Sequence, residues 1–166
     1  VALEILRRAP DRLTRLALID ASPLAETPQS AAAREMLIVK VKSGRLADAM
    51  REELNPVWLA PGPDRAAILE IALDMADTLG PEVYVRQARA LQRARDQQAV
   101  LRKCKVPTLV MCGEVGRLNP VKRHSFMAEL LPYAILRVIE GAGHLPTLEQ
   151  PEATTAAIKE WLKMPL

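Results

Sequence analysis

The segment from Val106 to Pro151 decides the fold: VPTLVMCGEVGRLNPVKRHSFMAELLPYAILRVIEGAGHLPTLEQP. Apolar and β-branched residues over Thr108–Cys112 predict a buried strand. Apolar residues at helical spacing predict a helix over 120–131, with a proline in its first turn. A second strand is predicted over Ala134–Ile139, and a glycine-rich loop with His144 follows it. Open α/β sheets keep their functional groups in loops at the carboxyl ends of parallel strands, so we expect a site at this loop.

Two parts of this segment, PTLVMCGEVGRLNP (107–120) and GAGHLPTLEQP (141–151), resemble motifs of the α/β-hydrolase family. The family patterns are PTLVxxGxxDxxxP and GxGHxxxxExP, and every fixed residue of the second is in register here. The resemblance implies an α/β class protein with a partial α/β-hydrolase fold. Its sheet would contain about three parallel strands flanked by helices: Leu13–Ile19, Thr108–Cys112 and Ala134–Ile139. The resemblance also implies that His144 is a catalytic histidine, which shuttles the proton of a nucleophile.

The acid of the triad is where the sequence departs from the family pattern. Gly116 stands at the position of the family aspartate and has no side chain with which to orient an imidazole. Asp20, at the end of the first predicted strand, is the alternative acid, because some family members carry their acid after that strand. Its other interpretation is a turn or cap residue before Pro23. Glu114, two residues from the family position, is a further candidate.

The first 23 residues resemble the family segment that follows the nucleophile elbow, whereas the elbow signature Gly-x-Ser-x-Gly is absent from this sequence. We therefore expect the nucleophile and the oxyanion donors to come from a segment outside it, and the chain to be inactive alone. The strand Leu13–Ile19 would then lack a neighbour. An open apolar edge favours pairing, so we expect a homodimer, or pairing with a separate N-terminal half, through this edge.

Residues 24–103 have almost no strand signal and predict a helical insertion. Apolar residues follow one face of a helix over 66–79, Gly80 ends it and Pro81 begins the next. Asp64 is the expected N-cap. The resemblance implies a hydrolase core (1–23 and 104–166) with a helical lid (24–103), and the other interpretation is an insertion that only buries apolar surface.

Composition excludes several classes of function. The net charge of +3 comes from interspersed acids and bases, and only 3% of residues are aromatic, so we expect no nucleic-acid partner. We also expect no membrane span or signal peptide, and no cofactor or metal. Cys104 and Cys112 are too few for a disulfide framework or a zinc site, and we expect Cys112 in the core. Reduced thiols favour a cytoplasmic location. His124 is expected at the surface of its helix.

Two functional hypotheses follow from the sequence. In the first, the chain is the C-terminal part of a serine hydrolase of small esters or related acyl compounds, and contributes His144 and the lid. In the second, it is a non-catalytic relative of such enzymes that self-associates through its open strand edge. Whether the chain is an enzyme stays open at this stage, because GxSxG is absent and Gly116 replaces the usual acid.

Overall fold

The computed structural model describes residues 1–54 and 56–166, which form two compact units. The sheet unit comprises residues 1–23, 57–61 and 97–166, and the helical unit comprises residues 24–56 and 62–96. Residues 57–61 and 97–103, which sequence analysis placed in the lid, thus group with the sheet unit. The assignment of the units as hydrolase core and lid stays a prediction.

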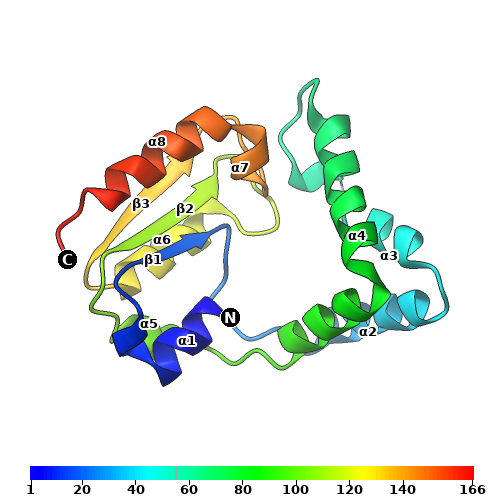
Figure 1. Cartoon of the computed structure of the whole chain (residues 1–166), viewed down its shortest axis with the longest axis horizontal. Coiled ribbons are helices and arrows are strands. Elements are labelled where there is room, and N and C mark those ends of the chain that lie inside the picture. The colour runs from blue at the N-terminus through cyan, green and yellow to red at the C-terminus, as the bar shows by residue number, and fades with distance from the viewer. Residues whose placement is uncertain (55) are drawn as a thin grey trace. The chain divides into compact units, whose positions relative to one another are not determined.

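The sheet unit contains one parallel sheet in the order β1-β2-β3 (Figure 1). The strands are β1 (Leu16–Ile19), β2 (Thr108–Gly113) and β3 (Ala134–Ile139). In register, Leu16 lies beside Thr108, which lies beside Ala134. Every residue of β2 is buried, as expected for the central strand of a parallel sheet. The predicted fold class, three parallel strands flanked by helices, is confirmed.

The first strand is shorter than predicted. Leu13 is the C-cap of a 3-10 turn, η1 (Pro10–Arg12), and only Leu16–Ile19 pair with β2. Leu16 N–H donates to the carbonyl of Pro107, just before β2 begins, so Thr14 and Arg15 have no pairing partner in that strand. No described strand pairs with the other edge of β1.

Side chains alternate across the sheet, so each strand contributes to two cores. On one face, Leu18 and Val110 pack with residues of α1 (Ala2–Arg8), α5 (Gln98–Leu101) and α6 (Val121–Leu130). On the other face, Leu109 and Met111 pack with Ala157 and Trp161 of α8 (Pro151–Leu162). The short helix α7 (Pro146–Glu149) precedes α8. Figure 1 shows α6 and α8 on opposite sides of the sheet.

The helical unit contains α2 (Pro28–Lys42), α3 (Leu46–Glu53) and α4 (Arg65–Gln92). The short turn η2 (Pro56–Trp58) follows α3. Gly80 interrupts α4 with φ 78° and ψ 171°, as the predicted break at this residue requires. Asp64 occupies the N-cap position of α4, but its side chain makes no capping hydrogen bond. No described helix is long and apolar enough to cross a lipid bilayer.

Candidate active site

The sheet unit brings together two of the residues that sequence analysis singled out. Asp20 directly follows β1, and His144 lies in the loop after β3. His144 Nδ1 and Asp20 Oδ1 are 3.1 Å apart. The Asp20 side chain is 3% exposed and that of His144 is 25% exposed, so a buried carboxylate lies beside an accessible imidazole. The two atoms are not aligned as a hydrogen bond, and neither Asp20 oxygen has another partner in the described part of the chain.

The backbone of Asp20 is held in a strained conformation. Its φ is 44°, and it is the one non-glycine residue with positive φ among those described. Aspartate tolerates this region better than most residues because its short side chain is small and polar. The Asp20 N–H donates to Met111 O at 2.8 Å, and the Asp20 carbonyl accepts from Asn119 Nδ2 at 3.0 Å. Such strain is typical of functional sites, where the surrounding structure enforces it.

The two other acid positions lie differently. A Cβ added at Gly116 would be 3.5 Å from Asp20 Oδ2, so the family acid position is adjacent to the Asp20 carboxylate. The Glu114 carboxylate instead accepts from the backbone N–H of Gly141, at the start of the histidine loop. Asp20 is therefore the acid that the fold places against His144.

Glu149 joins the histidine loop to the 57–61 segment. One carboxylate oxygen accepts from the N–H groups of Ala60, at 2.6 Å, and Gly143, at 2.9 Å. The other accepts from the N–H of Leu145 at 2.8 Å. Three backbone donors on one carboxylate are a strong, charge-assisted arrangement. Glu149 therefore fixes the backbone on both sides of His144. The sequence contained a signal for this residue, since it is the fixed glutamate of the loop motif.

Trp58 also contacts the histidine. The Trp58 carbonyl accepts from the His144 N–H at 2.8 Å, and the two rings are 6.2 Å apart in an edge-to-face arrangement at 75°. Gly143 permits this approach, because a Cβ there would be 2.4 Å from Trp58 O. No sequence signal pointed to Trp58, which lies almost ninety residues from the loop that it contacts.

The prediction that His124 lies at the surface is wrong, because its side chain is fully buried. The buried face of α6 contains His124, Met127 and Leu130, whereas Phe126 is 39% exposed. The apolar residues of this helix therefore did not all mark the buried face. Nδ1 of His124 lies 3.3 Å from Pro120 O, and Nε2 has no partner among the described residues. Burial lowers the pKa of His124, because it removes water from the charged form.

The low pKa of His124 predicts a loss of stability in mild acid. The unfolded state binds a proton below the ordinary histidine pKa of about 6.5, whereas the folded state resists it. The contribution of His124 to the free energy of unfolding is therefore complete above a pH of about 6.5, and it is lost as the pH falls toward the pKa of the folded state. We expect the free energy of unfolding from urea titrations to fall between pH 7.5 and 5.5, by at most about 1.4 kcal/mol per pH unit for one group. His124→Gln should flatten this slope, and equal slopes in both proteins would contradict the assignment.

Cys112, the residue before the last of the central strand, is fully buried, as predicted. Burial and then the charge of Asp20 raise the pKa of its thiol to about 11. At pH 8 the thiolate fraction would then be roughly one in a thousand, which is unsuited to a nucleophile. Cys104 is buried as well, and both cysteines are unpaired.

We expect iodoacetamide to leave the folded chain unmodified at pH 8 and to add two carbamidomethyl groups after denaturation, one for each cysteine. Intact-mass spectrometry distinguishes these states. Rapid modification of Cys112 in the folded chain would contradict its assignment as a core residue.

Comparison with known proteins identifies relatives of the whole chain. The family model described as "Alpha/beta hydrolase family" matches residues 1–158. A RutD protein of Pseudomonas savastanoi pv. phaseolicola, named as a carbamate hydrolase, is 30% identical over 154 residues. The alignment covers 91% of this chain and 59% of that protein.

Solved structures agree with this match. A thermophilic esterase from Thermogutta terrifontis is 30% identical with a TM-score of 0.91, and the match covers 98% of this chain and 60% of that one. An enol-lactonase from Burkholderia xenovorans LB400 shares the fold, with 21% identity, a TM-score of 0.81 and coverage of 98% and 61%. The chain thus spans about three fifths of the length of these relatives.

The family match extends over most of the chain, and the parallel sheet flanked by helices agrees with it. The chain belongs to the alpha/beta hydrolase family.

Proposed function

We propose that this chain is the C-terminal part of a serine hydrolase that acts on small esters or related acyl compounds. The observation that supports this most directly is the 3.1 Å contact between the buried Asp20 carboxylate and Nδ1 of His144. A carboxylate beside Nδ1 keeps the proton on that nitrogen, so Nε2 is left to accept a proton from a nucleophile and return it to the leaving group. The imperfect alignment of the pair is compatible with this role, because catalytic hydrogen bonds often tighten only when substrate is bound.

In this proposal each residue has a separate task. His144 is the general base and then the general acid, and Asp20 orients it and stabilises its charged form. Glu149 is a positioning residue, because it acts through the backbone on both sides of His144. A serine in a GxSxG turn, absent from this sequence, would supply the nucleophile and one oxyanion donor.

The test uses a completed enzyme, in which this chain follows the part of the Thermogutta terrifontis esterase that precedes the aligned region. We expect it to hydrolyse a short-chain p-nitrophenyl ester, and the chain alone to show only the buffer rate. His144→Ala and alanine at the added serine should each abolish the activity, whereas His124→Gln should retain most of it. Activity that survives His144→Ala in a folded protein would overturn the proposal.

A second function is supported by the edge of β1 with which no described strand pairs. Leu16 N–H and Asp20 N–H donate to the β2 side, so the N–H groups of Ala17 and Ile19 point to the other edge. We propose that, as a non-catalytic module, the chain would pair there with a second copy of itself or with a separate N-terminal half. Sedimentation at micromolar concentration should show a dimer that Ala17→Pro dissociates, because proline removes one edge donor. A monomer in the unsubstituted chain would count against self-pairing.

We also propose a cytoplasmic location. The two free cysteines favour a reducing compartment, where structural disulfides are rare. Fractionation of the source cells would test it, and recovery of the protein outside the cytoplasmic fraction would contradict it.

A further inference from the structure

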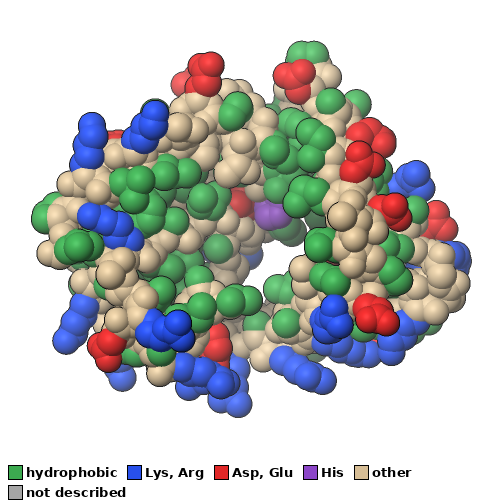
Figure 2. All heavy atoms as spheres, in the orientation of Figure 1, with side chains coloured by type: hydrophobic (Ala, Val, Ile, Leu, Met, Phe, Trp, Pro, Cys, Tyr) green, Lys and Arg blue, Asp and Glu red, His purple; other side chains and the backbone are tan. Residues whose placement is uncertain are grey.

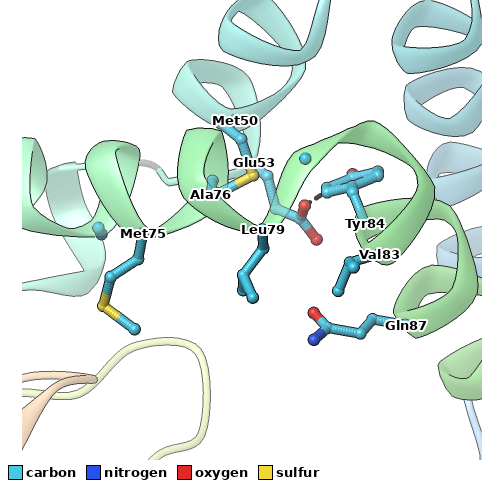
Figure 3. Close-up of a pocket in the computed structure, with 10 residues that line it drawn as sticks. Met50, Glu53, Met75, Ala76, Leu79, Val83, Tyr84 and Gln87 are labelled. Atoms are coloured by element: carbon cyan, nitrogen blue, oxygen red, sulfur yellow. Dashed lines mark hydrogen bonds between the residues drawn. The ribbon is translucent and has the colours of Figure 1, made fainter.

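The helical unit contains its own pocket, on the side of α4 where the helix breaks. Figure 3 shows Met75, Leu79 and Val83 along α4, with Met50 of α3 opposite them. The pocket has a volume of about 220 Å³. Its walls are mostly apolar, and Figure 2 shows apolar side chains grouped along α4.

The shape of the pocket depends on the break in α4. Gly80 has φ 78° and ψ 171°, a conformation that glycine adopts without steric cost. Pro81 follows, and the second part of the helix takes a new direction there. Leu79 and Val83 therefore come from two differently directed segments and form two walls of one hollow.

Glu53 and Tyr84, two of the polar residues that line the pocket, are already paired. Tyr84 Oη donates to Glu53 Oε2 at 2.7 Å, and Arg34 Nη1 donates to Glu53 Oε1 at 2.8 Å. Arg34 Nε also donates to Glu26 at 2.9 Å, so one guanidinium lies between two carboxylates. Burial raises the pKa of Tyr84, with a further contribution from Glu53, so the hydroxyl keeps its proton at neutral pH.

These charges restrict what the pocket accepts. Glu53 is 24% exposed and lines the pocket, and it would repel a ligand carboxylate. A cationic ligand would gain little, because both Glu53 oxygens already accept hydrogen bonds, one from Arg34 and one from Tyr84. A neutral ligand fits best.

The volume restricts the size of the ligand. A dry cavity of about 150 Å³ holds benzene, whereas whole drug-sized ligands need about 300 Å³ or more. A pocket of about 220 Å³ therefore suits one ring with a small substituent, or a branched alkyl group of similar size.

We propose that this pocket binds a neutral aromatic or branched-alkyl group of about six to eight carbon atoms, as part of an ester. Met50, Met75, Leu79 and Val83 contact the apolar group, and the Tyr84 hydroxyl oxygen and the Glu53 carboxylate mark its polar end. The inference rests on the proposed function for the statement that the ligand is an ester, whereas binding itself requires no hydrolysis.

The test measures binding of methyl benzoate to the whole chain by ¹H–¹⁵N NMR. Saturable shifts are expected at Leu79, Val83 and Tyr84. Benzoate has the same ring with a charge, and methyl acetate has the ester without the ring, so both should bind at least about tenfold more weakly. No saturable shift at these residues, or benzoate binding as tightly as methyl benzoate, would overturn the inference.

Two variants and a matched control locate the site. Ala76→Phe fills the pocket and should weaken binding at least about tenfold, whereas Ala67→Phe, the same change at an exposed position of α4, should alter it less than about twofold. Leu79→Ala removes one wall of the pocket. Leu79 is 52% exposed, so this change should leave the fold intact, and it decides the question if Ala76→Phe does not fold. Equal weakening by Ala76→Phe and Ala67→Phe, or full binding by Leu79→Ala, would overturn the inference.

The same titration on His144→Ala separates this inference from the proposed function. Binding is expected to be unchanged, since no lining residue belongs to the sheet unit. If the completed enzyme is inactive while methyl benzoate binds as described, the proposed hydrolase function fails and the pocket stands. If the enzyme is active and methyl benzoate does not bind, the pocket assignment alone fails.

Discussion

Asp20→Asn in the completed enzyme is expected to lower kcat for a p-nitrophenyl ester by about 10⁴, with a much smaller change in KM. Asparagine keeps the size of the side chain and tolerates the φ of 44° that this position requires. Its amide NH₂ can face Nδ1 and stabilise the wrong imidazole tautomer, so His144 loses the proton acceptor at Nε2. The loss should therefore fall on the chemical step.

The matched control is Asp11→Asn, which changes an exposed aspartate in the same unit. It should leave kcat within about twofold of the unsubstituted enzyme, because surface changes away from a site have small effects. Equal kinetics for Asp20→Asn and Asp11→Asn would remove Asp20 from the mechanism.

An aspartate at position 116 could restore the activity that Asp20→Asn removes. Such a rescue is not expected if Asp20 has only a structural role. A Cβ at this position would be 3.5 Å from Asp20 Oδ2, an ordinary contact, and Gly116 is not among the residues with positive φ. An aspartate there can place a carboxylate beside His144. We expect Gly116→Asp in the Asp20→Asn background to recover kcat by at least about tenfold. Recovery by Gly116→Ala in the same background would show that the rescue does not need a carboxylate.

The sequence predicted the central part of the sheet well for a physical reason. Residues 108–112 are apolar or β-branched, and the strand that they form is buried on both faces, so local composition and tertiary environment favour the same structure. The first strand was predicted three residues too long, because Leu13 is also apolar. In the structure the strand begins at Leu16, whose N–H donates to the Pro107 carbonyl just before β2.

The candidate site was predictable only in part. His144 lies in a local motif, and Asp20 was recognisable as one of several acids that follow or flank strands. The choice between Asp20 and Glu114 depends on which loop each carboxylate faces, and only the fold determines this. Trp58 belongs to the short segment 57–61, which in the sequence separates the two parts of the helical unit. No local periodicity indicates that this segment contacts His144.

Gly143→Ala is expected to cost about 2–4 kcal/mol of unfolding free energy, or to displace the 57–61 segment from the histidine loop. The added Cβ would be 2.4 Å from Trp58 O and 2.8 Å from both Ala60 N and Leu59 Cα. All three are backbone atoms, so no side-chain rotation relieves the overlap. Any movement of the segment breaks the bond from His144 N–H to Trp58 O and the bond from Ala60 N–H to Glu149.

Urea unfolding and hydrogen exchange distinguish the two results. Gly62→Ala is the matched control, because a Cβ there meets no atom within 4 Å and its φ is not positive. It should change the unfolding free energy by less than about 0.5 kcal/mol. In Gly143→Ala, the amide of His144 should exchange faster than in the unsubstituted chain, whether the segment moves or the unit loses stability. Unchanged stability together with an unchanged exchange rate at His144 would show that the loop and the 57–61 segment are not packed as described.

Glu149→Gln should also speed hydrogen exchange at the amides of Gly143 and Leu145. The substitution replaces one of the two acceptor oxygens with an NH₂ group, which is a donor and would face backbone donors.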